Sequence, residues 1–175
     1  MNSTPLATCT YDNTPVFSFK GSTFPAKAIS IYDGDTATFA VSVHGQHYAY
    51  KMRLSGIDTP EIRPSRKNPH RDEEKKAAMY ARNRFLQLVC NEDVDLDKPY
   101  TKKQIKAMLA KNQRVVHLKC GKFGKFGRAL VKVFLHEGDL TDRTKSVNKV
   151  LLREKLAYPY YGGAKNPDFR TYFRV

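Results

Sequence analysis

Hydrophobic and polar side chains alternate along two neighbouring stretches of the chain, from Thr38 to Val43 and from His47 to Met52. This alternation is typical of β-strands, because successive side chains of a strand point to opposite faces of the sheet. A short connection that contains a glycine, His44-Gly45-Gln46, separates the two stretches. The pattern predicts a β-hairpin. One wall of the core is expected on the faces formed by Phe39, Val41 and Val43 and by Tyr48, Tyr50, Met52 and Leu54.

Three further strands are predicted from short apolar or alternating runs. They span Pro25 to Ile31, Arg114 to Cys120 and Arg128 to Leu135. The segment from Gly121 to Gly127 is rich in Gly, Lys and Phe and joins the last two strands, so these form a second hairpin. The first residues, Met1 to Ser22, are nearly uncharged and rich in Ser, Thr, Asn and Pro, which is typical of a partly ordered arm.

Apolar residues at helical spacing predict three helices. The first has Asp72 as its N-cap and runs to about Val89. The second opens with a capping box between Thr101 and Gln104 and runs to Ala110. Buried positions are expected at Ala77, Ala81, Phe85 and Leu88 in the first helix, at Ile105, Met108 and Leu109 in the second, and at Val147, Val150, Leu151 and Leu156 in the third. Short strands interrupted by helices indicate a small antiparallel barrel, with an α+β sandwich as the alternative.

Length, charge and cysteine content narrow the class of protein. The chain has 175 residues, enough for one domain with its own core, and a formal net charge of +14. This charge favours a polyanionic partner, most simply nucleic acid, although membrane surfaces and heparin-like polymers attract it too. Cys9, Cys90 and Cys120 are odd in number and far apart, so free thiols are expected rather than a zinc site.

The chain shows neither a run of about 18 apolar residues nor the pattern of a secretory signal. We therefore expect an intracellular protein without a membrane partner. Nothing in the sequence indicates an obligate protein partner, and a monomer is expected.

The first hairpin brings four carboxylates to one edge of the sheet. Asp33 and Asp35 precede it, and Asp58 and Glu61 follow it. Crowded carboxylates raise one another's pKa unless a cation lies between them, and a hard cation with oxygen ligands is the natural occupant. The alternative is that these residues only form turns, since Asp, Gly and Pro all favour turns.

Asp35 and Asp58 are the best candidates for metal ligands, and the carbonyl of Thr59 adds a third oxygen. Such an oxygen-only set suits calcium or magnesium. Glu61 lies two residues beyond Thr59, close enough to position or deprotonate a water molecule. Its carboxylate stays ionised beside a metal, as a general base requires.

Arg53 and Arg128 are candidates for holding phosphoryl oxygens, because a guanidinium donates two hydrogen bonds at once and stays charged. The alternative for either residue is a surface charge or a salt bridge. Aromatic side chains that can stack nucleic-acid bases lie among Lys122, Lys125 and Arg153, although many such rings simply pack the barrel. They are Phe123, Phe126, Tyr158, Tyr160 and Tyr161.

Three motifs, in this order, resemble the staphylococcal nuclease (thermonuclease-like) family. They are Asp33-Gly34-Asp35-Thr36, Arg53-Leu54-Ser55-Gly56-Ile57-Asp58-Thr59-Pro60-Glu61 and Lys125-Phe126-Gly127-Arg128-Ala129-Leu130. A fourth piece, Val147-Asn148 with Leu156-Ala157-Tyr158, fits the same pattern, and the resemblance spans Ala26 to Tyr161. It implies a mainly β, α+β fold, namely a five-stranded OB-fold barrel with flanking helices. The barrel domain would span residues 23–175, with residues 91–112 as an insertion.

The resemblance also implies calcium-dependent hydrolysis of phosphodiester bonds in DNA and RNA that leaves 3′-phosphate ends, with calcium preferred to magnesium. Asp35, Asp58 and the Thr59 carbonyl would hold calcium, and Glu61 would orient or activate water. Arg53 and Arg128 would stabilise the five-coordinate phosphate. Contacts to the terminal phosphate and to the sugar or base would come from Lys125 and one of Tyr158, Tyr160 and Tyr161.

Two other functions compete with this one. A barrel of this shape can be a non-catalytic OB-fold module that binds nucleic acid or serves as a scaffold. A site that has lost its activity is expected to lack at least one of five charged residues, yet all five are present: Asp35, Arg53, Asp58, Glu61 and Arg128. A basic protein that coats nucleic acid is the third possibility. It predicts salt-sensitive binding that does not respond to chelators.

Overall fold

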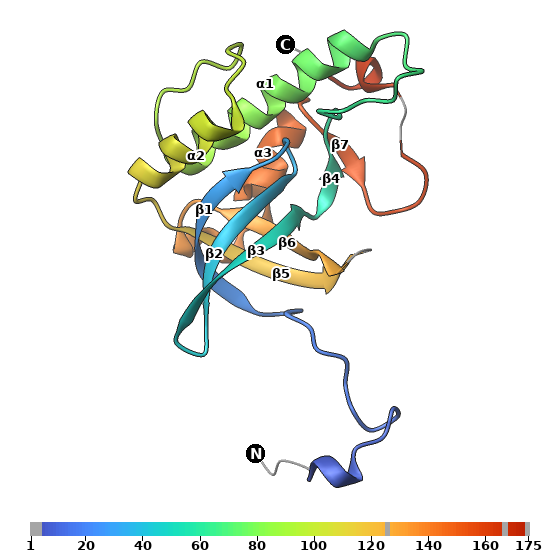
Figure 1. The fold of residues 1–175 in the computed structure, drawn as a ribbon. Coiled ribbons are helices and arrows are strands. Elements are labelled where there is room, and N and C mark those ends of the chain that lie inside the picture. Colours follow the sequence, from blue (N-terminus) through green and yellow to red (C-terminus); the bar gives the residue numbers. More distant parts are fainter. Residues whose placement is uncertain (1–4, 125–126, 166–167, 174–175) are drawn as a thin grey trace.

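The computed structural model, which describes residues 5–124, 127–165 and 168–173, shows a closed five-stranded barrel with flanking helices (Figure 1). The order around the barrel is β1-β2-β3-β6-β5. These strands are β1 (Thr23–Ile31), β2 (Thr36–Val43), β3 (Gln46–Leu54), β5 (Val116–Phe123) and β6 (Ala129–Phe134). The predicted mainly β, OB-like barrel is confirmed, and the sandwich alternative is wrong. The barrel is mixed rather than antiparallel as predicted, because β3 and β6 pair in parallel where it closes.

The β2–β3 hairpin turns at His44 and Gly45, whose φ angles are 50° and 79°. Two positive φ angles are the combination of a type I′ turn, whose twist matches that of the flanking strands. The pairing that follows places Thr36 opposite Arg53 at the other end of the hairpin. Tyr48 is exposed rather than in the core as predicted, because the tip of the hairpin extends beyond the barrel (Figure 1). The buried side chains of the hairpin are Ala37, Phe39, Val41, Met52 and Leu54.

Helix α1 (Arg71–Cys90) covers one end of the barrel. The prediction that Asp72 is the N-cap is wrong, because the amide of Arg71 already donates to the carbonyl of Asn68 and the N-cap is His70, two residues earlier. The carboxylate of Asp72 instead accepts from Lys75 at 3.0 Å. The predicted stripe is buried at Ala77, Ala81 and Phe85, while Leu88 is half-buried.

Helix α2 (Lys102–Lys111) lies within residues 91–112 and packs on β1. The predicted capping box is present, because Thr101 accepts from the amide of Gln104 and the Gln104 side chain accepts from the amide of Thr101. Ile105 and Leu109 are buried, and Met108 is half-buried. The apolar face of this short helix therefore joins the main core.

Helix α3 (Val147–Arg153) is tied to the barrel through Asn148, which is 3% exposed. Its side-chain amide donates to the carbonyls of Ser55 (2.9 Å) and Val131 (3.1 Å), and its oxygen accepts from the amide of Val133. Buried polar groups are stable when they are fully hydrogen-bonded in this way. Asn148 thereby fixes the end of β3 against β6, the two strands that position Arg53 and Arg128.

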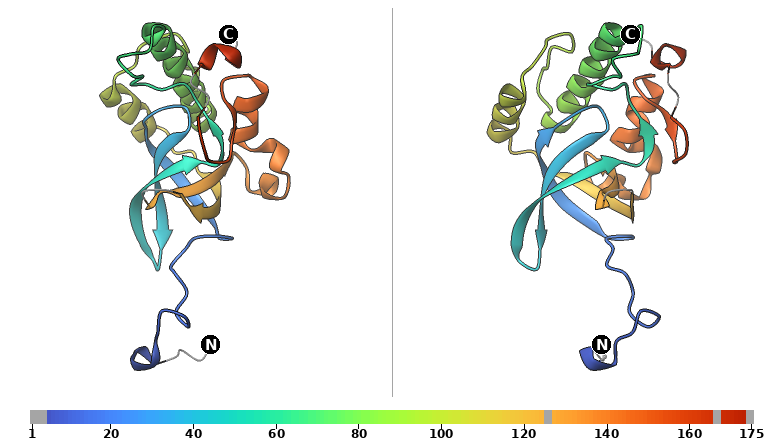
Figure 2. Two further views of the ribbon diagram at one scale, coloured as in Figure 1. Left: turned by 90° about the vertical axis from the view of Figure 1, so that its right-hand side faces the viewer. Right: turned by 45° about the vertical axis from the view of Figure 1, so that its right-hand side comes forward.

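Strand β4 (Gly56–Asp58) pairs with β7 (Tyr158–Tyr160) in a separate two-stranded sheet beside the barrel (Figures 1 and 2). The register places Asp58 opposite Tyr158 and Gly56 opposite Tyr160. The sequence analysis predicted no strand here. Two three-residue strands, one of which contains Pro159, carry too little alternation to be recognised.

The N-terminal segment leaves the barrel at the end opposite α1 (Figure 2). Residues 5–22 contain one 3₁₀ turn, Leu6–Thr8, and Phe19 packs edge-to-face on Phe24 and Tyr50. Among the described residues, no helix combines the length and apolar character needed to cross a membrane.

Candidate active site

The turn between β1 and β2 meets the segment that follows β4. The amide of Leu54 donates to the carbonyl of Asp35 (2.7 Å), and the amide of Thr59 donates to the Asp35 carboxylate (3.1 Å). A Cβ atom at Gly34 would lie 2.8 Å from the Thr59 methyl group and 3.0 Å from the Cβ of Ala81. Glycine is therefore required in the Asp-Gly-Asp motif for space, so that the two segments can approach each other.

Arg53 joins the two aspartates. One guanidinium nitrogen lies 2.9 Å from Asp35 Oδ1, and the other donates to Asp58 Oδ1. Its neighbours Met52 and Leu54 point into the barrel and are fully buried, so Arg53 points to the outer face of β3. The turn between β1 and β2 and strand β4 cover that face, and only 14% of the Arg53 side chain is exposed.

The electrostatics of this cluster are unbalanced. Burial raises the pKa of Asp35 well above its usual range, the charge of Asp33 adds to the rise, and Arg53 opposes it. Burial alone would lower the pKa of Arg53, yet the adjacent Asp35 and Asp58 raise it. One guanidinium therefore only partly neutralises the buried carboxylates, and an additional positive charge would be favourable here.

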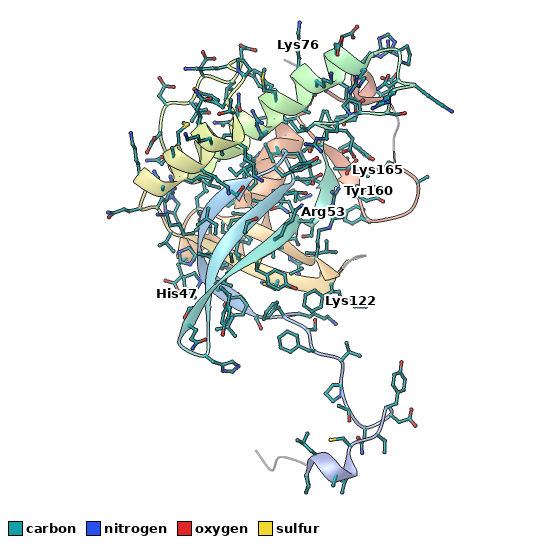
Figure 3. The ribbon with its side chains drawn as sticks, viewed as in Figure 1. His47, Arg53, Lys76, Lys122, Tyr160 and Lys165 are labelled. Atoms are coloured by element: carbon teal, nitrogen blue, oxygen red, sulfur yellow. The ribbon has the colours of Figure 1, made fainter. Side chains whose placement is uncertain are left out.

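Glu61 and Lys165 lie at the mouth of the cluster. The Lys165 ammonium is 3.0 Å from Asp58 Oδ1 and 2.5 Å from Glu61 Oε1. Figure 3 shows Lys165 beside Arg53 and Tyr160 at the edge of the small sheet. Lys165 could not be predicted from the sequence, because no motif surrounds it and its position depends on the path of the chain after β7.

Glu74 is a second residue that the sequence analysis assigned no role in the site. It is 7% exposed, and its carboxylate accepts from the backbone amide of Glu61 (3.1 Å) and from the side-chain amide of Asn68 (2.5 Å). In the structure, the Glu74 carboxylate fixes the backbone that carries Glu61.

Arg128 lies in the same pocket as Arg53. This pocket has a volume of about 480 Å³, and Tyr160, Tyr161 and Lys165 also line it. The Arg53 guanidinium is 6.0 Å from the centre of the Tyr160 ring, a distance at which a cation and an aromatic face attract. The structure thus brings together the two arginines that the sequence analysis selected as phosphate contacts.

The tyrosines have different surroundings. Tyr158 donates to Asp58 Oδ2 at 3.1 Å, so it supports a candidate metal ligand, whereas Tyr161 is 84% exposed at the rim of the arginine pocket. Lys125 and Phe126, the other candidate substrate contacts, lie outside the described residues.

A second pocket, of about 520 Å³, opens on the other side of Lys165. Asp58, Thr59 and Glu61 line this pocket, together with the start of α1 and the segment from Asp168 to Tyr172. We call it the carboxylate pocket. Because Lys165 lines both pockets, the pocket that contains Asp58 and Glu61 adjoins the pocket that contains Arg53 and Arg128.

The side-chain donors at the candidate metal position are all oxygen atoms, the type that a hard cation prefers. Asp35 and Asp58 are 2% and 3% exposed, and the hydroxyl of Thr59 is buried without a hydrogen-bond partner among the described residues. Within the same residues, no group of three or more His, Cys, Asp or Glu side chains is placed to hold a metal ion. A cation here would therefore rely on two carboxylates, on oxygens of Thr59, and on water or substrate oxygens.

Comparison with models of protein families and with curated proteins found no match to this chain.

Proposed function

We propose that this protein is a calcium-dependent nuclease of the staphylococcal nuclease type, which hydrolyses phosphodiester bonds of DNA and RNA and leaves 3′-phosphate ends. One observation carries the proposal: Arg53 spans the buried Asp35 and Asp58, and it shares its pocket with Arg128. Two carboxylates for a hard cation and two guanidinium groups for a phosphate are the chemistry that such a reaction needs.

Calcium fits the donor set better than a transition metal, because every available donor is an oxygen atom. Asp35, Asp58 and the carbonyl of Thr59 would hold the ion, which when bound would offset the charge that develops on a phosphoryl oxygen. Magnesium is the less suitable alternative. It demands a near-ideal octahedral set of ligands, whereas calcium accepts six to eight oxygens in irregular arrangements.

The remaining residues divide the work of binding and proton transfer. Arg53 and Arg128 would donate hydrogen bonds to the oxygens of the attacked phosphate, where negative charge grows. Glu61 lines the carboxylate pocket with 47% of its side chain exposed, so it can accept a proton from an attacking water molecule. Tyr160 and Tyr161 offer aromatic faces beside the arginines for a sugar or a base.

Incubation of the purified protein with supercoiled plasmid at moderate salt tests the proposal directly. We expect degradation with calcium, much less with magnesium and none with a chelator, and the products should carry 3′-phosphate ends. Plasmid left intact under all three conditions would overturn the nuclease proposal. If the plasmid were bound but not cut, the non-catalytic binding module would be favoured instead.

Lys165 is expected to weaken calcium binding. Its ammonium lies against Asp58 and Glu61, and even two unit charges of the same sign about 4 Å apart repel by about 4 kcal/mol at an effective dielectric constant of 20. Because 43% of the Lys165 side chain is exposed and can move into solvent, only part of this repulsion will remain. Lys165→Met should therefore raise the calcium affinity roughly tenfold, measured by titration calorimetry.

Lys145→Met provides the matched control, since Lys145 also forms an ion pair but contacts Asp139 rather than the site. Its calcium affinity should equal that of the unmodified protein. Equal affinities for the Lys165→Met and Lys145→Met proteins would contradict the interpretation.

A further inference from the structure

Four basic side chains converge on a pocket that the proposed reaction does not use. The pocket has a volume of about 310 Å³ and lies where α2 approaches the outer face of the barrel. Lys51 comes from β3, Arg63 from the loop after β4, Arg82 from the middle of α1 and Lys102 from the first turn of α2. These elements are far apart in the sequence, and only the fold brings the four charges together.

The pairing of strands β1, β2 and β3 places three polar side chains side by side in this pocket. Ser30 of β1 pairs with Thr38 of β2, and Thr38 pairs with Lys51 of β3. Side chains at paired positions lie on the same face of a sheet. Two hydroxyl groups and one ammonium group therefore form a row across the outside of the barrel, and all three line the pocket.

The four basic side chains form no ion pairs with the other described residues. Among the ion pairs formed by the described residues, none involves Lys51, Arg63, Arg82 or Lys102. Lys51 lies 5.1 Å from the centre of the Tyr32 ring, which adds an aromatic face to the pocket but no negative charge. Like charges held near one another raise the free energy of a folded protein unless an anion joins them.

Arg82 is the most buried of the four. It donates to the carbonyl of Tyr100 (3.0 Å) and to the side chain of its neighbour Asn83, while its Nε atom is buried and has no hydrogen-bond partner among the described residues. Burial lowers its pKa, and Asp33 is the acidic group that acts in the opposite direction. Arg82 thus adds a partly buried positive charge to the wall of the cationic pocket.

The pocket adjoins the candidate active site. Glu61 and Pro64 line the carboxylate pocket, whereas Ile62 and Arg63, which lie between them in the sequence, line the cationic pocket. A strand with a phosphate near Asp35 and Asp58 could therefore cross this short segment and place another phosphate among the four basic residues.

From this geometry we infer that the cationic pocket is a second phosphate-binding site, which holds a backbone phosphate of a single-stranded nucleic acid at a distance from the linkage that is cut. This inference rests on the proposed function for the identity of the strand. The four cations and two hydroxyl groups recognise the phosphate, and the exposed ring of Tyr32 can stack a base beside it.

Two double variants with the same change in net charge test the inference. Lys51→Gln with Lys102→Gln removes two charges from the pocket, and Lys103→Gln with Lys106→Gln removes two exposed charges from α2 outside it. All four lysines are exposed, so both proteins should fold, and thermal melting will verify this. Binding of a fluorescein-labelled oligothymidylate is measured by anisotropy in the presence of a chelator, which separates binding from cleavage.

We expect the pocket variant to bind the oligonucleotide about tenfold more weakly than the α2 control at low salt. The slope of log K against log salt should fall by about 0.7, because the pocket holds one backbone phosphate and each neutralised phosphate of a single strand contributes about 0.7. Equal binding by the two variants would overturn the inference. Calorimetry with pyrophosphate tests whether the pocket binds a small free anion instead of a strand. If the pocket variant lost pyrophosphate binding but bound the oligonucleotide as well as the control does, the pocket would bind a free anion and the inference would be wrong.

The outcome is independent of the plasmid experiment. Weakened binding by the pocket variant, in a protein that never cuts plasmid, would refute the nuclease proposal and leave the phosphate site standing. Calcium-dependent cleavage with equal binding by both variants would refute the phosphate site alone.

Discussion

Replacing Arg128 by alanine is expected to lower the rate of phosphodiester cleavage several hundredfold while leaving the free energy of unfolding nearly unchanged. A guanidinium that meets charge developing on the phosphate lowers the barrier to cleavage by about 3–4 kcal/mol. Within the described part of the chain, the Arg128 side chain forms no hydrogen bond or ion pair, so its loss leaves no buried partner uncompensated. The measurement is kcat on an oligonucleotide at saturating calcium, together with a denaturant unfolding curve.

Two variants make this result specific. Arg143→Ala removes an exposed arginine outside the site and should change the rate little, which controls for the loss of one positive charge. Arg128→Lys keeps the charge but not the planar fork, and it should recover only part of the rate. A fall of less than fivefold for Arg128→Ala, or a similar fall for Arg143→Ala, would remove Arg128 from the proposed reaction centre.

The fold could be predicted where local chemistry decides it. The alternating residues around Gly45 predicted the central hairpin, and the spacing of Thr101 and Gln104 predicted the start of α2. The prediction failed for the start of α1, because the amide of Arg71 donates to the backbone carbonyl of Asn68 in the preceding loop. The helix therefore begins without the side chain of Asp72 as its cap. The small sheet of β4 and β7 also escaped, since tertiary pairing rather than alternation creates such short strands.

The same distinction applies to the charged residues. Asp35 and Asp58 could be placed together from the sequence because one hairpin connects them, and a hairpin reverses the chain in a predictable way. The direction of the Arg53 side chain, which joins them, could not be predicted. Lys165 and Lys102 could not be placed, because each reaches its position through a long path that the sequence does not specify. In a chain with 31 lysines and arginines, no local pattern separates these two from the rest.

The charge balance at Arg53 leads to an expected result on stability. Arg53→Ala should lower the free energy of unfolding by about 3–5 kcal/mol in the presence of a chelator, because it leaves two buried carboxylates without their shared partner. Calcium should restore a large part of this loss, since a cation bound to the native state alone stabilises it by mass action. The measurement is denaturant unfolding with chelator and with calcium.

Arg84→Ala is the matched control. Arg84 makes two hydrogen bonds to Glu154, at 2.7 and 2.8 Å, but the two side chains are 25% and 34% exposed. Water therefore screens the pair, and its loss should cost about 1 kcal/mol or less, by the same amount with calcium as with chelator. If Arg53→Ala cost no more than Arg84→Ala, or if calcium stabilised both variants equally, the two aspartates would not form the cation site on which the proposed function depends.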